Sequence, residues 1–319
     1  MMRSILYFLA CFFVLSVRVS AQQESQFTMF MYNTQWLNPG YVGSRNLASV
    51  QALVRTQWQG FEGAPQSQVV SFNAPFFNKR VGFGLTAFHR TIGIDDQVYG
   101  NIAYSYALVN KPKFSLRGGL QGSAKRYAMD FASPLNVAII PTDPTMISDK
   151  ATSMVFNVGA GLYATFGDAY FGVSVPALLN NDIGFLDGTL DTSATEQRHI
   201  YGVAGAMFPL SSTLMLKPAV QVKVAPNSPF DIDFNAMVFY NLKIGAGISY
   251  RLGGDMGGLG ESLDLLLHYQ LSDKLGIGAA YDYSLSRLKV ANKGSFELFL
   301  RYDIGSEKVI MTNPRTFLR

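Results

Sequence analysis

Residues 274–283 read KLGIGAAYDY, and the character of their side chains alternates at every second position. Successive side chains of a β-strand point to opposite faces, so this stretch forms one apolar face and one face of small or charged side chains. The apolar face carries Leu275, Ile277, Ala279, Tyr281 and Tyr283, and the other carries Gly276, Gly278, Ala280 and Asp282. Such a period of two predicts a strand with one apolar surface.

The same alternation recurs along the rest of the chain and predicts about fourteen strands. They cover residues 49–58, 66–75, 80–89, 97–108, 112–126, 152–165, 168–177, 197–208, 213–224, 230–240, 242–252, 261–271, 274–284 and 294–303. A soluble β-sandwich also has half-buried strands, but its strands average about 5–6 residues. The predicted segments are closer to the roughly 9–11 residues that cross a bilayer at a tilt.

The composition agrees with membrane-spanning strands. Of 319 residues, 48% are hydrophobic and 15% are charged, whereas soluble domains carry about 25% charged residues. No interior run approaches the roughly 20 apolar residues of a membrane helix. A transmembrane β-barrel explains both facts, because its apolar residues occupy alternate positions of many strands. Aromatic residues at the strand ends resemble interfacial girdles, as at Trp58, Tyr104, Tyr106, Tyr250, Tyr281, Tyr283 and Tyr302.

The gaps between the predicted strands alternate in length. Short gaps fall at 76–79, 109–111, 166–167, 209–212, 241 and 272–273, and longer ones at 59–65, 90–96, 127–151, 178–196, 253–260 and 285–293. The gap 225–229 is intermediate. Outer-membrane barrels have short periplasmic turns and longer outer loops. We therefore predict an all-β fold: an antiparallel barrel of the outer membrane over residues 49–303, with a periplasmic C-terminal tail over 304–319.

Residues 1–21 have the features of a secretory signal peptide. Arg3 supplies a positive charge, residues 5–17 an apolar core, and Val19-Ser20-Ala21 a small-residue cleavage site. Cleavage removes the only cysteine, Cys11. It also removes two of the 26 Lys and Arg residues, which leaves 24 against 22 Asp and Glu and a net charge of +2. This balance gives no reason to expect nucleic-acid binding.

Residues 22–48 form a periplasmic N-terminal segment that combines apolar anchors with turn residues. The anchors are Phe27, Phe30, Trp36, Leu37 and Tyr41, and the turn residues are Asn38, Pro39, Gly40 and Gly43. Each exposed anchor would cost roughly 1.5–3 kcal/mol relative to a buried one. We expect the segment to lie at or inside the periplasmic mouth, where it either plugs the lumen or docks a partner.

The strand faces opposite the apolar ones carry charges of both signs. The candidate lumen charges are Arg55, Arg117, Lys125, Lys217, Arg251, Asp282, Glu297 and Arg301, together with Lys223, Asp231, Asp233 and Asp264. These charges either line a pore or pair with one another, and the mixture of signs favours pairing. The three histidines, His89, His199 and His268, have no metal-ligand spacing, and no phosphate-binding loop is present. We predict no catalytic, cofactor-binding or metal-binding residues and no enzyme activity.

Several short motifs resemble those of one family. They are Gln26-Phe27, Met31-Tyr32-Asn33, LNPGYVGS at 37–44, VRTQWQGFEGAPQSQVVSFNAP at 54–75 and NPRTF at 313–317. Together they resemble the PorP/SprF family of type IX secretion system membrane proteins from Bacteroidetes-type bacteria. The resemblance implies a role in the export or surface display of proteins that carry a C-terminal sorting domain. The implied partners are other secretion components or a dedicated cargo such as a gliding adhesin.

Two other functions remain open from the sequence. A general outer-membrane porin or solute channel would show the same strand pattern and loop rhythm. A barrel enzyme such as a lipase or protease would need a catalytic constellation, and the sequence contains none that can be recognised.

Overall fold

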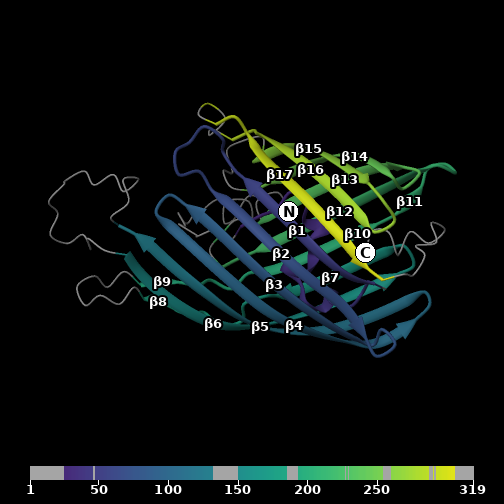
Figure 1. Ribbon diagram of the computed structural model, residues 1–319, viewed down its shortest axis with the longest axis horizontal. Helices are drawn as coiled ribbons and strands as arrows, with labels where there is room; N and C mark the ends of the chain where they lie inside the picture. The colour runs from purple at the N-terminus through teal and green to yellow at the C-terminus, as the bar shows by residue number, and fades with distance from the viewer. Residues whose placement is uncertain are drawn as a thin grey trace, which may run out of the picture.

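The computed structural model describes residues 25–45, 47–131, 150–184, 193–226, 228, 230–253, 260–286, 290 and 292–305. Fourteen antiparallel strands close into one barrel (Figure 1). Their bounds are β1 Ala48–Thr56, β2 Gln66–Phe76, β3 Val81–Ile92, β4 Asp95–Lys111, β5 Phe114–Asp130, β6 Lys150–Phe166, β7 Ala169–Val175, β10 Ile200–Ala206, β12 Leu214–Val224, β13 Asp231–Tyr240, β14 Ile244–Leu252, β15 Ser262–Gln270, β16 Leu275–Ser284 and β17 Ser295–Ile304.

The barrel closes because its first and last strands pair. The register of β1 on β17 runs from Ala48 opposite Ile304 to Thr56 opposite Phe296. On the other side of the ring, β10 pairs with both β7 and β12, and β11 (Phe208–Pro209) adds a short pairing to β12. A closed ring leaves no strand edge unpaired, as the hydrocarbon of a membrane requires. The predicted antiparallel barrel of about fourteen strands is confirmed.

Inside and outside alternate along each strand. In β15, Asp264, Leu266 and His268 are at most 2% exposed, whereas the neighbouring Leu265 and Leu267 are about 60% exposed. Large apolar side chains therefore cover the outer surface, and polar side chains share the interior with a smaller apolar set. None of the helices in the described part of the chain is long and apolar enough to cross a membrane.

Most connections follow the predicted alternation of lengths, but the predicted longer gap 90–96 is wrong, because only Gly93 and Ile94 separate β3 from β4 at that end. The turn from β13 to β14 is tight: Asn241 and Leu242 both have positive φ, 49° and 56°, and Lys243 N–H donates to the Tyr240 carbonyl at 3.0 Å. Positive φ at both central residues gives the turn a twist that matches the flanking strands. We call the end with short turns the periplasmic end and the end with longer loops the outer end.

Strand limits differ from the sequence prediction mainly at the outer end. Both flanking strands extend into the predicted loop 127–151, since Asp130 of β5 pairs with Lys150 of β6. The predicted loop 178–196 contains a small two-stranded sheet, β8 (Asp182–Gly184) with β9 (Ser193–Thr195). Pairing carries β3 to β6 beyond the region where apolar and polar residues alternate, whereas β7 and β10 are shorter at this end than predicted.

Candidate functional site

The interior of the barrel holds residues 25–45, which we call the N-terminal segment. Every residue from 26 to 43 is buried, and Figure 1 shows the purple chain enclosed between the blue and the green and yellow walls. Near the periplasmic end, Arg45 pairs with Asp303 of β17 at 2.8 Å. Near the outer end, Gln26 donates to Asp231 of β13 at 2.9 Å. The segment therefore extends along the lumen from the periplasmic end to the outer end, deeper than the predicted place at or inside the periplasmic mouth.

Three short helices fold the segment into a compact body. They are η1 (Phe30–Tyr32), α2 (Thr34–Leu37) and η2 (Pro39–Tyr41). Asn38 caps η2, because its Oδ1 accepts a hydrogen bond from Gly40 N–H at 2.8 Å. Pro39 stands at the first helical position, where its fixed φ suits the helix and its missing N–H costs nothing.

A buried carboxylate of β17 anchors the outer part of the segment. Glu297 accepts the backbone N–H of Thr28 at 2.9 Å and that of Met29 at 2.7 Å. Arg55 of β1 pairs with Glu297 at 3.0 Å and also with Asp282 of β16. The Thr28 hydroxyl donates to Asp282 at 2.9 Å and accepts from Arg55 at 3.0 Å. Arg55 thus pairs with two buried carboxylates, and Glu297 also satisfies two backbone donors of the segment.

An aromatic cluster fixes the middle of the segment to one wall. The Trp36 ring lies 4.5 Å from that of Phe88 and 5.2 Å from that of Tyr99, centroid to centroid. Phe27 meets Trp36 edge-on at 6.3 Å. Rings at these separations gain energy beyond the burial of their area.

Tyr32 makes the corresponding contacts with the opposite wall. Its ring stacks on Phe299 at 4.7 Å and on His268 at 5.3 Å, and the Lys217 ammonium lies 5.0 Å from its centroid. Burial raises the pKa of the Tyr32 phenol well above its ordinary value. The hydroxyl therefore stays protonated, and it donates to the Met237 sulfur at 3.6 Å.

Polar side chains of the segment bond directly to the strands. Gln35 Nε2 donates to the carbonyls of Phe72 and Leu85, each at 3.0 Å. Asn38 Nδ2 donates to the Leu162 carbonyl at 2.9 Å. In return, the Ser174 hydroxyl of β7 donates to the Leu37 carbonyl at 2.7 Å. These bonds attach the segment to β2, β3, β6 and β7.

Glycines on the inner wall allow the segment to approach closely. A Cβ added to Gly82 would collide with the Val42 carbonyl, and one added to Gly119 would collide with the backbone of Pro39 and Gly40. The wall glycines that face the segment in this way are Gly82, Gly84, Gly119, Gly161, Gly172 and Gly278. A strand glycine often marks the place where another backbone comes near. These glycines form the groove that accommodates the N-terminal segment.

All the residues predicted for a plug or docking role lie inside the barrel. Phe27, Phe30, Trp36, Leu37, Asn38, Pro39, Gly40, Tyr41 and Gly43 are each buried. Four polar residues that also attach the segment were not among the predicted ones: Gln26, Thr28, Gln35 and Arg45. Of these, only Thr28 lies between two apolar residues, so the sequence offers no common sign of their role.

The predicted lumen charges all point inward, and most are paired. Arg55, Arg117, Lys217, Arg251, Asp282, Glu297 and Arg301 are buried, and Lys125 is largely so. Arg251 pairs with Asp233 at 2.6 Å and Lys223 with Asp231 at 2.6 Å. The structure thus brings most of these charges together in pairs of opposite sign.

Two of the lumen cations use other partners. Arg117 donates to the carbonyl of Lys79 at 2.9 Å, so it supports the periplasmic turn between β2 and β3. Lys125 pairs at 2.9 Å with Glu196, a residue that the sequence analysis placed in a loop. Glu196 also accepts from Asn157 at 2.8 Å. The chain after β7 therefore folds back onto the outer ends of β5 and β6.

The comparison with protein families decides the assignment. The chain matches the family model for the type IX secretion system membrane protein PorP/SprF over residues 19–302. It belongs to the PorP/SprF family. This PorP/SprF chain is therefore an outer-membrane barrel of a type IX secretion system.

Solved structures resemble the PorP/SprF chain in fold. The toluene transporter TbuX of Ralstonia pickettii superposes with a TM-score of 0.51 at 11% identity, over 87% of this chain and 93% of that one. The outer membrane protein Omp33 of Acinetobacter baumannii has a TM-score of 0.47 at 8% identity, over 82% of this chain and 100% of that one. At these identities, the likeness to TbuX concerns the fold alone. A search of curated protein sequences finds no significant match.

Within the described residues, no group of three or more His, Cys, Asp or Glu side chains is arranged to hold a metal ion. His89 contacts Asp96 on the outer surface, His199 contacts the Gln197 carbonyl and His268 stacks on Tyr32. The structure thus places the three histidines in three separate surroundings.

Proposed function

We propose that this barrel supports the export or surface display of proteins with a C-terminal sorting domain, and that it acts through protein contacts. The observation that carries the proposal is the occupied lumen. The N-terminal segment bonds to β1, β13, β16 and β17 at the outer end and to β2, β3, β6 and β7 deeper inside. A solute would have to displace a segment held on both walls.

We also propose that the N-terminal segment acts as a plug and not as an arm that docks a partner. Its apolar anchors are already used against the barrel wall, as Trp36 is against Phe88 and Tyr99. An anchor buried in the lumen presents no surface to a periplasmic protein. Partner contacts would then fall on the loops and rims of the barrel. The partner is either the secretion machinery or one dedicated cargo such as a gliding adhesin.

A deletion strain tests the proposed role. The gene is deleted and then restored with the intact chain, and surface proteins with sorting domains are quantified alongside uptake of small solutes. We expect the deletion to lower surface display of one or more such proteins while solute uptake stays unchanged. Loss of a single adhesin would indicate a dedicated cargo, and a general loss would indicate a machinery role.

The opposite result would favour a solute channel. Normal display in the deletion strain, combined with wide ohmic conductance of the purified intact chain in planar bilayers, would reject the proposal. The conductance is measured on the intact chain, because the proposal concerns the barrel with the N-terminal segment in its lumen.

A further inference from the structure

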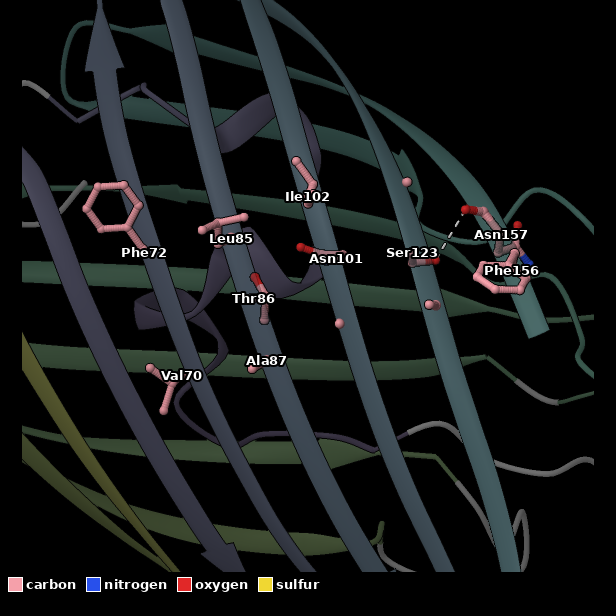
Figure 2. A pocket seen from close by; sticks show the side chains of 13 residues that line it. Val70, Phe72, Leu85, Thr86, Ala87, Asn101, Ile102, Ser123, Phe156 and Asn157 are labelled. Atoms are coloured by element: carbon pink, nitrogen blue, oxygen red, sulfur yellow. Dashed lines mark hydrogen bonds between the residues drawn. The ribbon is translucent and has the colours of Figure 1, made fainter. Parts of the chain in front are cut away.

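The lipid-facing surface of the barrel carries a hollow of about 740 Å³ over strands β2 to β6 (Figure 2). Its floor consists of small residues in one cross-strand row: Ala87 of β3 pairs with Gly100 of β4, and Gly100 pairs with Ala124 of β5. The same row ends in Val70 on one side and Phe156 on the other. Figure 2 shows these two side chains on opposite sides of the hollow, with Ala87 between them. Its size falls within the roughly 300–1,000 Å³ of small-molecule sites.

The next cross-strand row, toward the outer end of the barrel, carries two polar side chains with a valine between them. His89, Val98 and Arg126 are in register across β3, β4 and β5. Each is two residues, or about 7 Å along the strand, from the corresponding floor residue. The hollow thus has an apolar base and a charged upper edge, which is the shape of a site for an amphiphile.

One carboxylate holds the two basic side chains of this row side by side. Asp96 accepts from His89 Nε2 at 2.8 Å and from Arg126 Nη2 at 2.8 Å. The side chains of His89 and Arg126 remain 40% and 39% exposed on the outside of the barrel. A guanidinium has five N–H donors in a planar fork, and this arrangement suits phosphate oxygens. The bond to Asp96 therefore orients Arg126 while further donors face outward.

The hollow lies toward the outer leaflet. Gly100 is five residues from Asp95, where β4 begins at the outer end. That distance is roughly 17 Å along a strand, and the strands of such barrels tilt by about 35–45° from the membrane normal. The charged row, nearer the strand end, falls where the headgroups of outer-leaflet lipids lie.

A second hollow of the barrel provides a contrast. It measures about 550 Å³ and lies over β1 and β14 to β17, with Ala279 in its wall. In the next cross-strand row toward the outer end of the barrel, its neighbours are Leu265, Tyr281 and Phe296. This hollow has an apolar base of similar size without a charged edge, so it serves as an internal control.

We propose that the hollow over β2 to β6 binds an outer-leaflet lipid with an anionic phosphate headgroup. One acyl chain lies over Ala87, Gly100 and Ala124, and the phosphate accepts hydrogen bonds from Arg126, with His89 beside it. The site is independent of the lumen and of the proposed secretion role, because its side chains belong to the outward face of the strands.

Native mass spectrometry of the detergent-purified full chain tests the site. The probes are dimyristoyl phosphatidylglycerol, which is anionic, and dimyristoyl phosphatidylcholine, which has the same acyl chains but no net charge. We expect the first bound molecule of phosphatidylglycerol to bind about tenfold more tightly than the first molecule of phosphatidylcholine. A tenfold difference in affinity is the size expected for one charge-assisted hydrogen bond. Equal affinities for the two lipids would overturn the proposal.

Four variants locate the binding, and each is first checked for the heat-dependent gel shift of a folded barrel. R126Q should lower the affinity for the anionic lipid about tenfold. G100L should lower the affinity for both lipids, and it fits the fold because a Cβ at Gly100 has no neighbour nearer than 3.9 Å. A279L fills the other hollow, and K113Q removes an exposed charge at a periplasmic turn. Both should bind as the parent does.

Two further results would reject the site. One is unchanged binding of the anionic lipid to R126Q and G100L. The other is a G100L variant that retains both lipids but loses a co-purifying membrane protein, since that result would assign the hollow to a protein segment.

Discussion

Replacing Glu297 by glutamine should release the N-terminal segment from the outer part of the lumen. The carboxylate accepts two backbone N–H groups, from Thr28 at 2.9 Å and from Met29 at 2.7 Å, and pairs with Arg55 at 3.0 Å. A glutamine has nearly the same shape but only one acceptor oxygen, and its amide is a donor. One of the two backbone donors therefore loses its partner.

The size of the effect follows from these contacts. An unsatisfied buried donor costs about 1–3 kcal/mol. Breaking a buried ion pair costs up to about 3–5 kcal/mol, but Arg55 retains Asp282, so this contribution is smaller here. We expect a total near 2–4 kcal/mol, which corresponds to a roughly 30- to 700-fold larger population of the released state.

Cysteine labelling measures that population. The chain has one cysteine, Cys11, which lies in the predicted signal peptide, so an introduced cysteine is unique in the mature chain. M31C places a thiol where the parent side chain is 5% exposed, and a maleimide reacts with it only when the segment opens. With fast reclosure, the labelling rate follows the open fraction. The rate should rise by the factor given above in M31C/E297Q.

The matched control is M31C/E62Q, which makes the same substitution at an exposed outer residue and should label as M31C alone does. D273C, at an exposed periplasmic turn, gives the rate for a free thiol. An M31C rate that E297Q leaves unchanged would contradict the anchoring role of Glu297, and an M31C rate as fast as that of D273C would contradict the burial of the segment.

Three further changes test other contacts of the segment. W36A removes a ring that is 6% exposed and packed on two aromatic residues. It should cost about 3–5 kcal/mol, seen as a lower urea midpoint, while F61A at a 40% exposed position should not shift it. G119A drives a Cβ into the backbone of the segment and should cost about 1–3 kcal/mol. If the labelling rate of a cysteine at position 31 stays unchanged in G119A, the close approach of the segment to Gly119 is contradicted. D303N removes a carboxylate that contacts both Arg45 and Arg301, so it should cost about 3–5 kcal/mol. That loss should exceed the loss in R45M, and equal urea midpoints for the two variants would contradict the shared role of Asp303.

The barrel could be predicted from the sequence because lipid and lumen impose opposite requirements on alternate positions. The stretch from Ser262 to Gln270 shows this directly: its buried positions carry Asp264 and His268, and its exposed positions carry Leu265 and Leu267. Strand ends were less predictable. Outside the hydrocarbon layer the alternation loses its cause, and pairing such as that of Asp130 with Lys150 decides where a strand ends.

The N-terminal segment could be predicted only in part. Its apolar anchors require burial, and the sequence identifies them, but no periodicity connects them to a particular wall. The contacts that decide their position join residues far apart in the chain, as Thr28 and Asp282 do across 254 positions. The role of the inward glycines could not be predicted for the same reason. The strand pattern places Gly119 in a strand, but the backbone that approaches it belongs to Pro39 and Gly40, far away in the sequence.

Planar-bilayer conductance tests most directly whether residues 25–45 close the barrel. The full chain and a variant that lacks residues 25–44 are purified in the same detergent, checked for the folded gel shift and inserted at equal amounts. The plug predicts small or absent conductance for the full chain and wide, ohmic openings for the deletion variant. Equal conductance of the two proteins would contradict it.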